Sequence, residues 1–222
     1  MNIELAEECM RKGMQLSNMG DIDGAIKMFM SAINNAPEYD CAYFNLGVMF
    51  GIKGDYESAI FYYDKAILLY PRDFEYRFNR AHAYGKVNKL ELAIQEYREA
   101  LRLDSFRKEI NFNIGTIYAK LGQFEYAIQH FNEELQINPN DIDTLLQRAV
   151  CNFNIQNYDE AFMDTFKVIN LNPNISDAYY LQAKLSSQTD FPDEAINDIK
   201  IAISLDPSNI EYRRFFEELT NS

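Results

Sequence analysis

The chain has 222 residues, 47% of them hydrophobic, and a formal net charge of −13 at pH 7. This charge argues against nucleic acid as a partner, because phosphates would be repelled over most of the surface. The sequence has no run of about 18 apolar residues, which a membrane span would need. It also lacks the basic-then-apolar N-terminal signal of a secreted protein, so we expect a cytoplasmic protein.

Helical periodicity appears from the first residues and is clearest in the stretch 42–71. Tyr43, Leu46, Gly47 and Phe50 stand at i, i+3, i+4 and i+7, which is one face of a helix. The same spacing returns after a break at Gly54, and a proline at position 71 ends the second helix. The stretch predicts two short amphipathic helices, which need neighbours to bury their apolar faces.

The pattern repeats every 34 residues along the chain. Prolines fall at 37, 71, 139, 173 and 207, and alanines at 25, 59, 93, 127, 161 and 195. We therefore predict helix-pair repeats at 6–39, 40–73, 74–107, 108–141, 142–175 and 176–209, and a further helix at 210–220. Ser105 replaces the proline between the third and fourth repeats, and we expect the array to be weakest there.

The period and the residues resemble the tetratricopeptide repeat, a 34-residue helix–turn–helix. In the second repeat the family pattern is matched by Gly47, Phe50, Ala59, Tyr63 and Pro71. The resemblance implies an all-α fold: a right-handed superhelical α-solenoid of antiparallel helix pairs. We expect one solenoid over 6–222, with 210–220 as a capping helix.

One position in each repeat marks the turn between its two helices. Gly, Asn and Asp tolerate the left-handed backbone found at helix C-termini. Five repeats carry such a residue, at Gly20, Gly54, Asn88, Gly122 and Asp190. The fifth repeat has Gln156 instead, where we expect an altered or strained turn.

The resemblance implies that the first helices line a concave groove with positions 2, 5, 6, 9, 12 and 13 of each repeat. Position 6 is Asn45, Asn79 and Asn113 in three consecutive repeats, followed by Gln147. Side-chain amides offer donors and an acceptor to a peptide backbone, as similar asparagine ladders in the family do. The alternative is that these amides simply face water.

Position 5 carries large apolar side chains beside the amides. The candidates for anchoring a partner are Phe44, Phe78, Phe112 and Tyr180. Such a row would accept an aliphatic or aromatic group of a bound segment. The alternative is lateral packing between adjacent first helices, and both can hold for one side chain.

Position 2 is acidic in most repeats, including Glu75, Glu109 and Asp143. Acids in a helix's first turn interact favourably with its dipole, by about 0.3–1 kcal/mol each, and we favour this as the reason for their presence. They still make one groove edge negative. The family's chaperone-binding members clamp a C-terminal carboxylate with Lys and Arg, and those cations are missing here, so we do not expect such a clamp.

Other candidates for chemistry are weak. His82 and His130 stand at unrelated positions of their repeats, and the three cysteines are far apart, so we expect no metal site. Nucleophile elbows and phosphate loops are absent. Arg80 and Arg148 occupy position 7, which usually faces the core, so we expect a carboxylate near each or a snorkelling side chain.

We therefore predict a non-catalytic scaffold or adaptor without a cofactor. It would bind an extended or helical segment, basic or neutral, with apolar anchors. One alternative is a structural protein that assembles with its own copies. Another is the recognition region of a longer enzyme, or a chaperone for specific clients.

Overall fold

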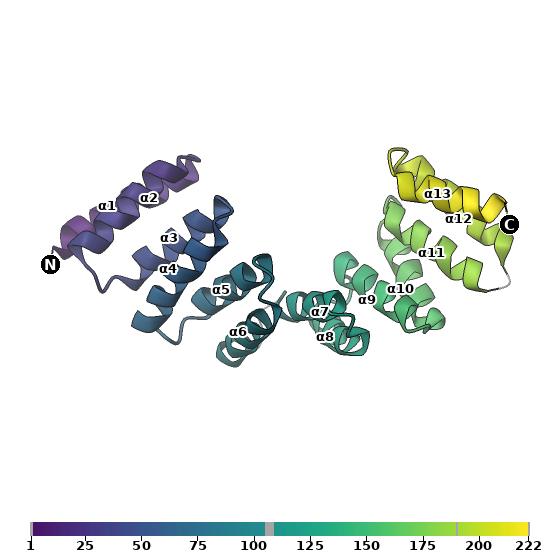
Figure 1. The fold of residues 1–222 in the computed structure, drawn as a ribbon, viewed down its shortest axis with the longest axis horizontal. Helices are drawn as coiled ribbons and strands as arrows, with labels where there is room; N and C mark the ends of the chain where they lie inside the picture. The colour runs from purple at the N-terminus through teal and green to yellow at the C-terminus, as the bar shows by residue number, and fades with distance from the viewer. Residues whose placement is uncertain (1, 105–108, 190, 222) are drawn as a thin grey trace. The chain divides into compact units, whose positions relative to one another are not determined.

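The computed structural model describes residues 2–104, 109–189 and 191–221, and these residues form thirteen α-helices and no strand (Figure 1). Six helices open the predicted repeats: α1 (Ile3–Asn18), α3 (Asp40–Ile52), α5 (Phe74–Lys86), α7 (Ile110–Lys120), α9 (Ile142–Asn154) and α11 (Ser176–Gln188). Six close them: α2 (Ile22–Asn35), α4 (Tyr56–Leu69), α6 (Leu90–Leu103), α8 (Phe124–Ile137), α10 (Tyr158–Leu171) and α12 (Pro192–Leu205). The last is α13 (Ile210–Thr220).

Six helix pairs followed by one further helix agree with six repeats and a final helix, and the exact repeat bounds stay a prediction. Ser105 and Asp190, which the sequence singled out at a junction and a turn, lie outside the described residues. In the part of the chain that the structure describes, no helix combines the length and apolar character needed to cross a membrane.

Aspartates begin several of the helices. Asp21 and Asp55 precede α2 and α4, and their carboxylates accept hydrogen bonds from the backbone N–H groups of Gly24 (2.9 Å) and Ser58 (3.1 Å). Each bond satisfies a donor that has no partner inside the helix. In the first two repeats the aspartate therefore sets the point at which the second helix starts.

Small residues let the two helices of a pair approach closely. A Cβ atom built on Gly47 would lie 2.4 Å from the Tyr63 ring, and one on Gly115 would lie 2.6 Å from the Phe131 ring. The six alanines of the 34-residue pattern are completely buried. The recurrent glycine and alanine positions are therefore packing positions, as the amphipathic pattern predicts.

The turns of five repeats adopt the left-handed backbone, and two of these turns do so without a glycine. Gly54 has φ +80°, and the equivalent residues Asn88 and Gln156 have φ values of 59° and 62°. The turn at Gln156 therefore keeps the geometry of its relatives, so the predicted departure takes the form of strain and not of an altered turn.

The chain divides into two compact units, one up to Ile110 and one from Asn111 onward. The N-terminal unit contains α1–α6, and each helix packs on the next. The C-terminal unit contains α8–α13, stacked in the same way, and α7 from Asn111 onward. Each is a stack of helix pairs of the α-solenoid class. A single undivided solenoid over 6–222 stays a prediction.

Candidate functional site

In the N-terminal unit, Asn45 and Asn79 occupy the same register on α3 and α5, two first helices that contact each other. Each amide donates to the carbonyl oxygen one turn earlier in its own helix, Asn45 to Cys41 (2.7 Å) and Asn79 to Glu75 (2.8 Å). An asparagine amide can make further hydrogen bonds. These bonds fix the orientation of both side chains.

The two aromatic candidates of this unit both pack against other rings. The Phe44 ring stacks on Tyr76 of the next first helix, with centroids 4.8 Å apart, and lies 5.8 Å from Tyr63. Phe78 makes an edge contact with Tyr97, at 5.6 Å. Both rings are half-buried. Phe44 therefore packs between adjacent first helices, as the alternative expected, whereas Phe78 packs on the second helix of its own repeat.

A cavity of about 210 Å³ lies among α3, α4 and α5. Asn79 lines it together with Val48 and Ile52 of α3 and His82 of α5. These residues stand at positions 6, 9 and 13 of their repeats. From the sequence, His82 was considered only as a metal ligand, and Val48 and Ile52 were not selected. All three could have been found, because positions 9 and 13 are among those expected to line the groove.

The predicted acids differ in their placement. Glu75 and Asp143 lie in the first turns of α5 and α9, where the helix dipole favours them. Glu109 does not share this position: its φ is +77°, which is not helical, so α7 starts one residue later at Ile110. The expectation that Glu109 belongs to a first turn is corrected accordingly.

In the C-terminal unit, Asn113 and Gln147 are both half-buried, on α7 and α9. The Phe112 ring lies 6.0 Å from Phe131. Tyr180 packs against α13, 4.9 Å from the Tyr212 ring, and its hydroxyl donates to Glu211 (2.9 Å). Burial raises the pKa of Tyr180, and the bond to Glu211 raises it further. Much of Tyr180 is therefore engaged with the final helix.

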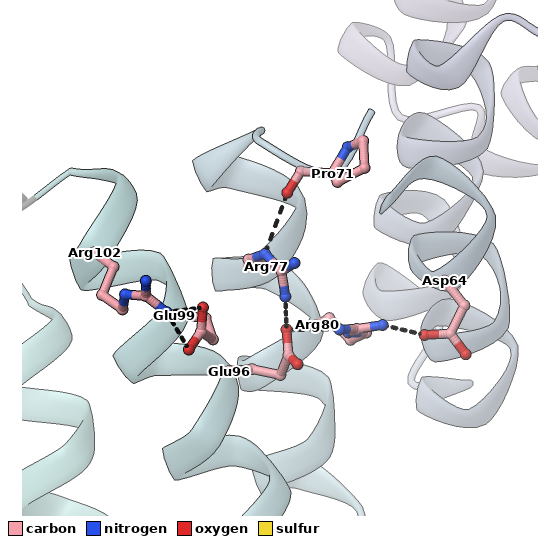
Figure 2. A network of polar contacts seen from close by, with 7 residues as sticks. All are labelled: Asp64, Pro71, Arg77, Arg80, Glu96, Glu99 and Arg102. Carbon is pink, nitrogen blue, oxygen red and sulfur yellow. Dashed lines mark hydrogen bonds and ion pairs between the residues drawn. The ribbon is translucent and has the colours of Figure 1, made fainter. Parts of the chain in front are cut away.

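The two position-7 arginines confirm the expectation of nearby carboxylates. Figure 2 shows Arg80 of α5, which reaches Asp64 of α4 (2.6 Å) and Glu96 of α6 (2.7 Å). Arg77 donates to the same Glu96 (3.2 Å). Burial alone would lower the pKa of Arg80, but the hydrogen bonds to Glu96 and Asp64 outweigh it, and the pKa is raised.

A second network of the same form exists in the C-terminal unit. Arg148 of α9 makes a bidentate ion pair with Asp164 of α10, donating two hydrogen bonds (2.8 and 2.6 Å). It also donates to Asn132 of α8. Asp164 is almost fully buried. Both arginines thus join their first helix to the two second helices beside it, which is a structural role.

Neither histidine takes part in a cluster of metal ligands. His130 Nδ1 lies 3.1 Å from Asn111 Oδ1, and the His130 ring stacks on Tyr118. Within residues 2–104, 109–189 and 191–221, no group of three or more His, Cys, Asp or Glu side chains is arranged to hold a metal ion.

The N-terminal end of the first pair carries a cavity of about 250 Å³. Ile3 and Glu7 of α1 line it, with Glu38 and Tyr39 of the following turn. Ile3 is 59% exposed. This apolar end bears on the alternative of self-assembly.

Sequence models of the tetratricopeptide repeat match residues 6–39, 41–73 and 78–142. The chain belongs to the tetratricopeptide repeat (TPR) family. Such repeats indicate a protein–protein interaction scaffold, and TPR proteins are generally non-catalytic. No curated protein sequence matches the chain.

Solved structures share the fold at low sequence identity. PilF of Pseudomonas aeruginosa has a TM-score of 0.79 at 20% identity, over 97% of this chain and 98% of that one. YrrB, a TPR protein with an unusual peptide-binding site, has a TM-score of 0.73 at 22% identity, over 85% and 97%. A TPR protein from Parabacteroides merdae has a TM-score of 0.71 at 20% identity, over 99% and 100%.

Proposed function

We propose that this TPR protein is a non-catalytic scaffold that binds a segment of a partner protein on its first-helix faces. The observation that carries the proposal is the cavity lined by Asn79, His82, Val48 and Ile52. It combines an oriented amide with apolar walls, which is the composition of a site that holds a main chain and accepts one side chain. YrrB supplies a precedent for peptide binding by the fold.

The chemistry of the expected partner follows from the side chains beside this cavity. Phe44 and Phe78 expose part of their rings, and Glu75 stands at the start of α5. In the C-terminal unit, Asp143 has the equivalent place on α9, with Gln147 one turn further along. A basic or neutral segment with apolar anchors therefore fits these faces better than an acidic one.

The test compares the wild-type protein with the double variant Asn45→Ala/Asn79→Ala in capture from a lysate of the source cell. A partner held by the wild type should be reduced about ten-fold or more by the double variant, because two amide contacts to its backbone are lost. Circular dichroism and mass in solution verify that both proteins are equally folded.

The matched control is Asn35→Ala on α2. Asn35 donates to the carbonyl oxygen of Ser31 (2.8 Å), the same intrahelical bond that Asn45 and Asn79 make, but it stands on a second helix. If Asn35→Ala reduces capture as much as the double variant does, or if the double variant retains the partner, the first-helix face is not the site.

The exposed Ile3 at the N-terminal cavity favours self-assembly as a second candidate function. Sedimentation velocity over a hundred-fold range of concentration tests it. Association that disappears in Ile3→Glu supports assembly through this end, and a monomer at every concentration excludes it.

A further inference from the structure

The C-terminal unit contains a cavity of about 630 Å³ that the first-helix site does not use. It lies among α10, α11 and α12, and aromatic and acidic side chains share its wall. Phe162, Phe166 and Phe191 are 43%, 54% and 57% exposed, so the cavity opens to the surface. Its acids are Asp159, Glu194 and Asp198.

This cavity occupies a recurring place in the repeats. Arg80 and Arg148 each contact a residue 16 positions earlier on the preceding second helix and an acid 16 positions later on their own second helix. In the sixth repeat, the same spacing relates Gln182 to Phe166 and Asp198. All three line the cavity.

The sixth repeat therefore keeps the acid of the network but lacks its arginine. Asp164 and Glu96 are neutralised by Arg148 and Arg80, whereas Asp198 shares its cavity wall with the uncharged Gln182. No cation forms an ion pair with Asp198 in the part of the chain that the structure describes. Burial, with the nearby Glu194, raises the pKa of Asp198 to about 6.

We propose that this cavity binds the side chain of an arginine carried by a partner protein, in the place that Arg80 and Arg148 occupy within their own repeats. The Asp198 carboxylate would receive the guanidinium, and the Phe166 ring would stand where Asn132 meets Arg148. An arginine guanidinium stacks well on an aromatic face.

The remaining volume indicates what surrounds the arginine in the partner. A cavity of about 630 Å³ exceeds the space that one guanidinium needs, and Tyr158, Phe162 and Leu185 give the rest an apolar wall. The occupant is therefore an arginine next to an apolar residue. This site lies on other helices than Asn45 and Asn79. Its test is therefore independent of the test of the proposed function.

The experiment titrates the full chain with acetyl-Leu-Arg-Leu-amide and follows amide chemical shifts by NMR. The comparison peptide has citrulline in place of arginine, which keeps the shape and removes the charge. We expect the arginine peptide to shift residues of α10–α12 and to bind about ten-fold or more tightly than the citrulline peptide, since a charged hydrogen bond is lost in the latter.

Two variants test the role of the network. Asp198→Asn should remove the preference for arginine. Gln182→Arg should supply the missing cation from within, which abolishes peptide binding and raises the melting temperature by about 2–4 °C. The matched control, Asp193→Asn, removes the same charge from α12 outside the cavity wall and should bind like the wild type.

Several results would overturn the proposal. Equal binding of both peptides, no binding up to about 5 mM, or an equal loss in Asp193→Asn and Asp198→Asn would each do so. Sedimentation velocity tests a different occupant: a dimer of the wild type that dissociates in Asp198→Asn would assign the cavity to a second copy of this chain instead.

Discussion

Gln156 adopts the left-handed backbone conformation that glycine adopts at the equivalent position of three other repeats. Its φ is 62°, and its N–H donates to the carbonyl oxygen of Phe153 (3.0 Å), which closes the end of α9. A residue with a Cβ pays roughly 1–2 kcal/mol for the left-handed region. Replacing Gln156 by glycine would remove this strain, but part of the gain is lost because glycine loses more conformational freedom on folding.

We therefore expect Gln156→Gly to raise the free energy of unfolding by about 0.5–1 kcal/mol, as measured by urea denaturation. Gly54→Gln, the reverse change at an equivalent turn with φ +80°, is the control and should lower it by a similar amount. A destabilising effect of Gln156→Gly would show that the glutamine side chain contributes contacts worth more than the strain.

Asp198 makes stability depend on pH in the sense opposite to an ordinary paired acid. Its pKa is about 6 in the folded protein and about 3.9 in an unfolded chain, so the folded state binds more protons between these values. Stability therefore falls as pH rises from about 4 through 6 and is level above that.

The measurement is the difference in unfolding free energy between wild type and Asp198→Asn across this range. Because the carboxyl is partly solvated, we expect a change on the order of 1 kcal/mol. The variant keeps Asp159 and Glu194 of the same cavity, so the two proteins differ only in the carboxyl at position 198. A difference that does not vary with pH would contradict the raised pKa.

At the scale of helices, Arg148 connects α9 to both of its neighbours. Replacing it leaves the buried Asp164 without a cation, and removing one partner of a buried pair typically costs about 3–5 kcal/mol. We expect Arg148→Met to lose about 3 kcal/mol of stability in chemical denaturation. A loss below about 1 kcal/mol would show that water replaces the guanidinium.

The double variant Arg148→Met/Asp164→Leu provides the control. It removes both charges and keeps similar volume, so it should recover much of the lost stability. If it is no more stable than Arg148→Met, the loss comes from packing and not from an unpaired charge.

The helices themselves were predictable, because a constant period places Ala59, Gly47 and their equivalents at the same contact in every pair. The kind of partner that Arg80 needs was also predictable, since a buried cation requires an anion. Which acids serve was not, because Asp64 and Glu96 come from separate helices whose facing sides depend on the packing.

The cavity of α10–α12 could not be predicted from the sequence either, because it also depends on how the helices pack. Gln182 is unremarkable by itself, and its meaning appears only when Phe166 and Asp198 are found on either side of it. The lateral packing of Phe44 was one of two readings that the sequence left open, because spacing does not tell a ring that anchors a partner from one that fills the gap between two helices.

At the scale of the whole molecule, the two compact units predict a local response to damage. In repeat arrays each repeat contacts only its neighbours, so stability is a sum of short-range terms. Gly47→Ala would drive a Cβ into the Tyr63 ring of the N-terminal unit, at a cost of about 1–3 kcal/mol.

Hydrogen exchange should then show faster exchange in α3 and α4, with α9–α13 unchanged. Gly85→Ala is the control, because nothing lies within 4 Å of its added Cβ, and it should slightly slow exchange in α5. Faster exchange throughout both units after Gly47→Ala would mean that the array unfolds as one cooperative body.

Arg80 and Arg148 stand two repeats apart, so the effect of deleting repeats on Arg148 depends on which repeats are removed. Excising the fourth repeat alone, residues 108–141, would set Arg148 after Arg98 in the register that Asn132 now fills. Excising residues 74–141 would instead set it after Asp64, the carboxylate that Arg80 uses. Excising the third and fourth repeats together would therefore offer Arg148 a carboxylate, whereas excising the fourth alone would bring it to another arginine.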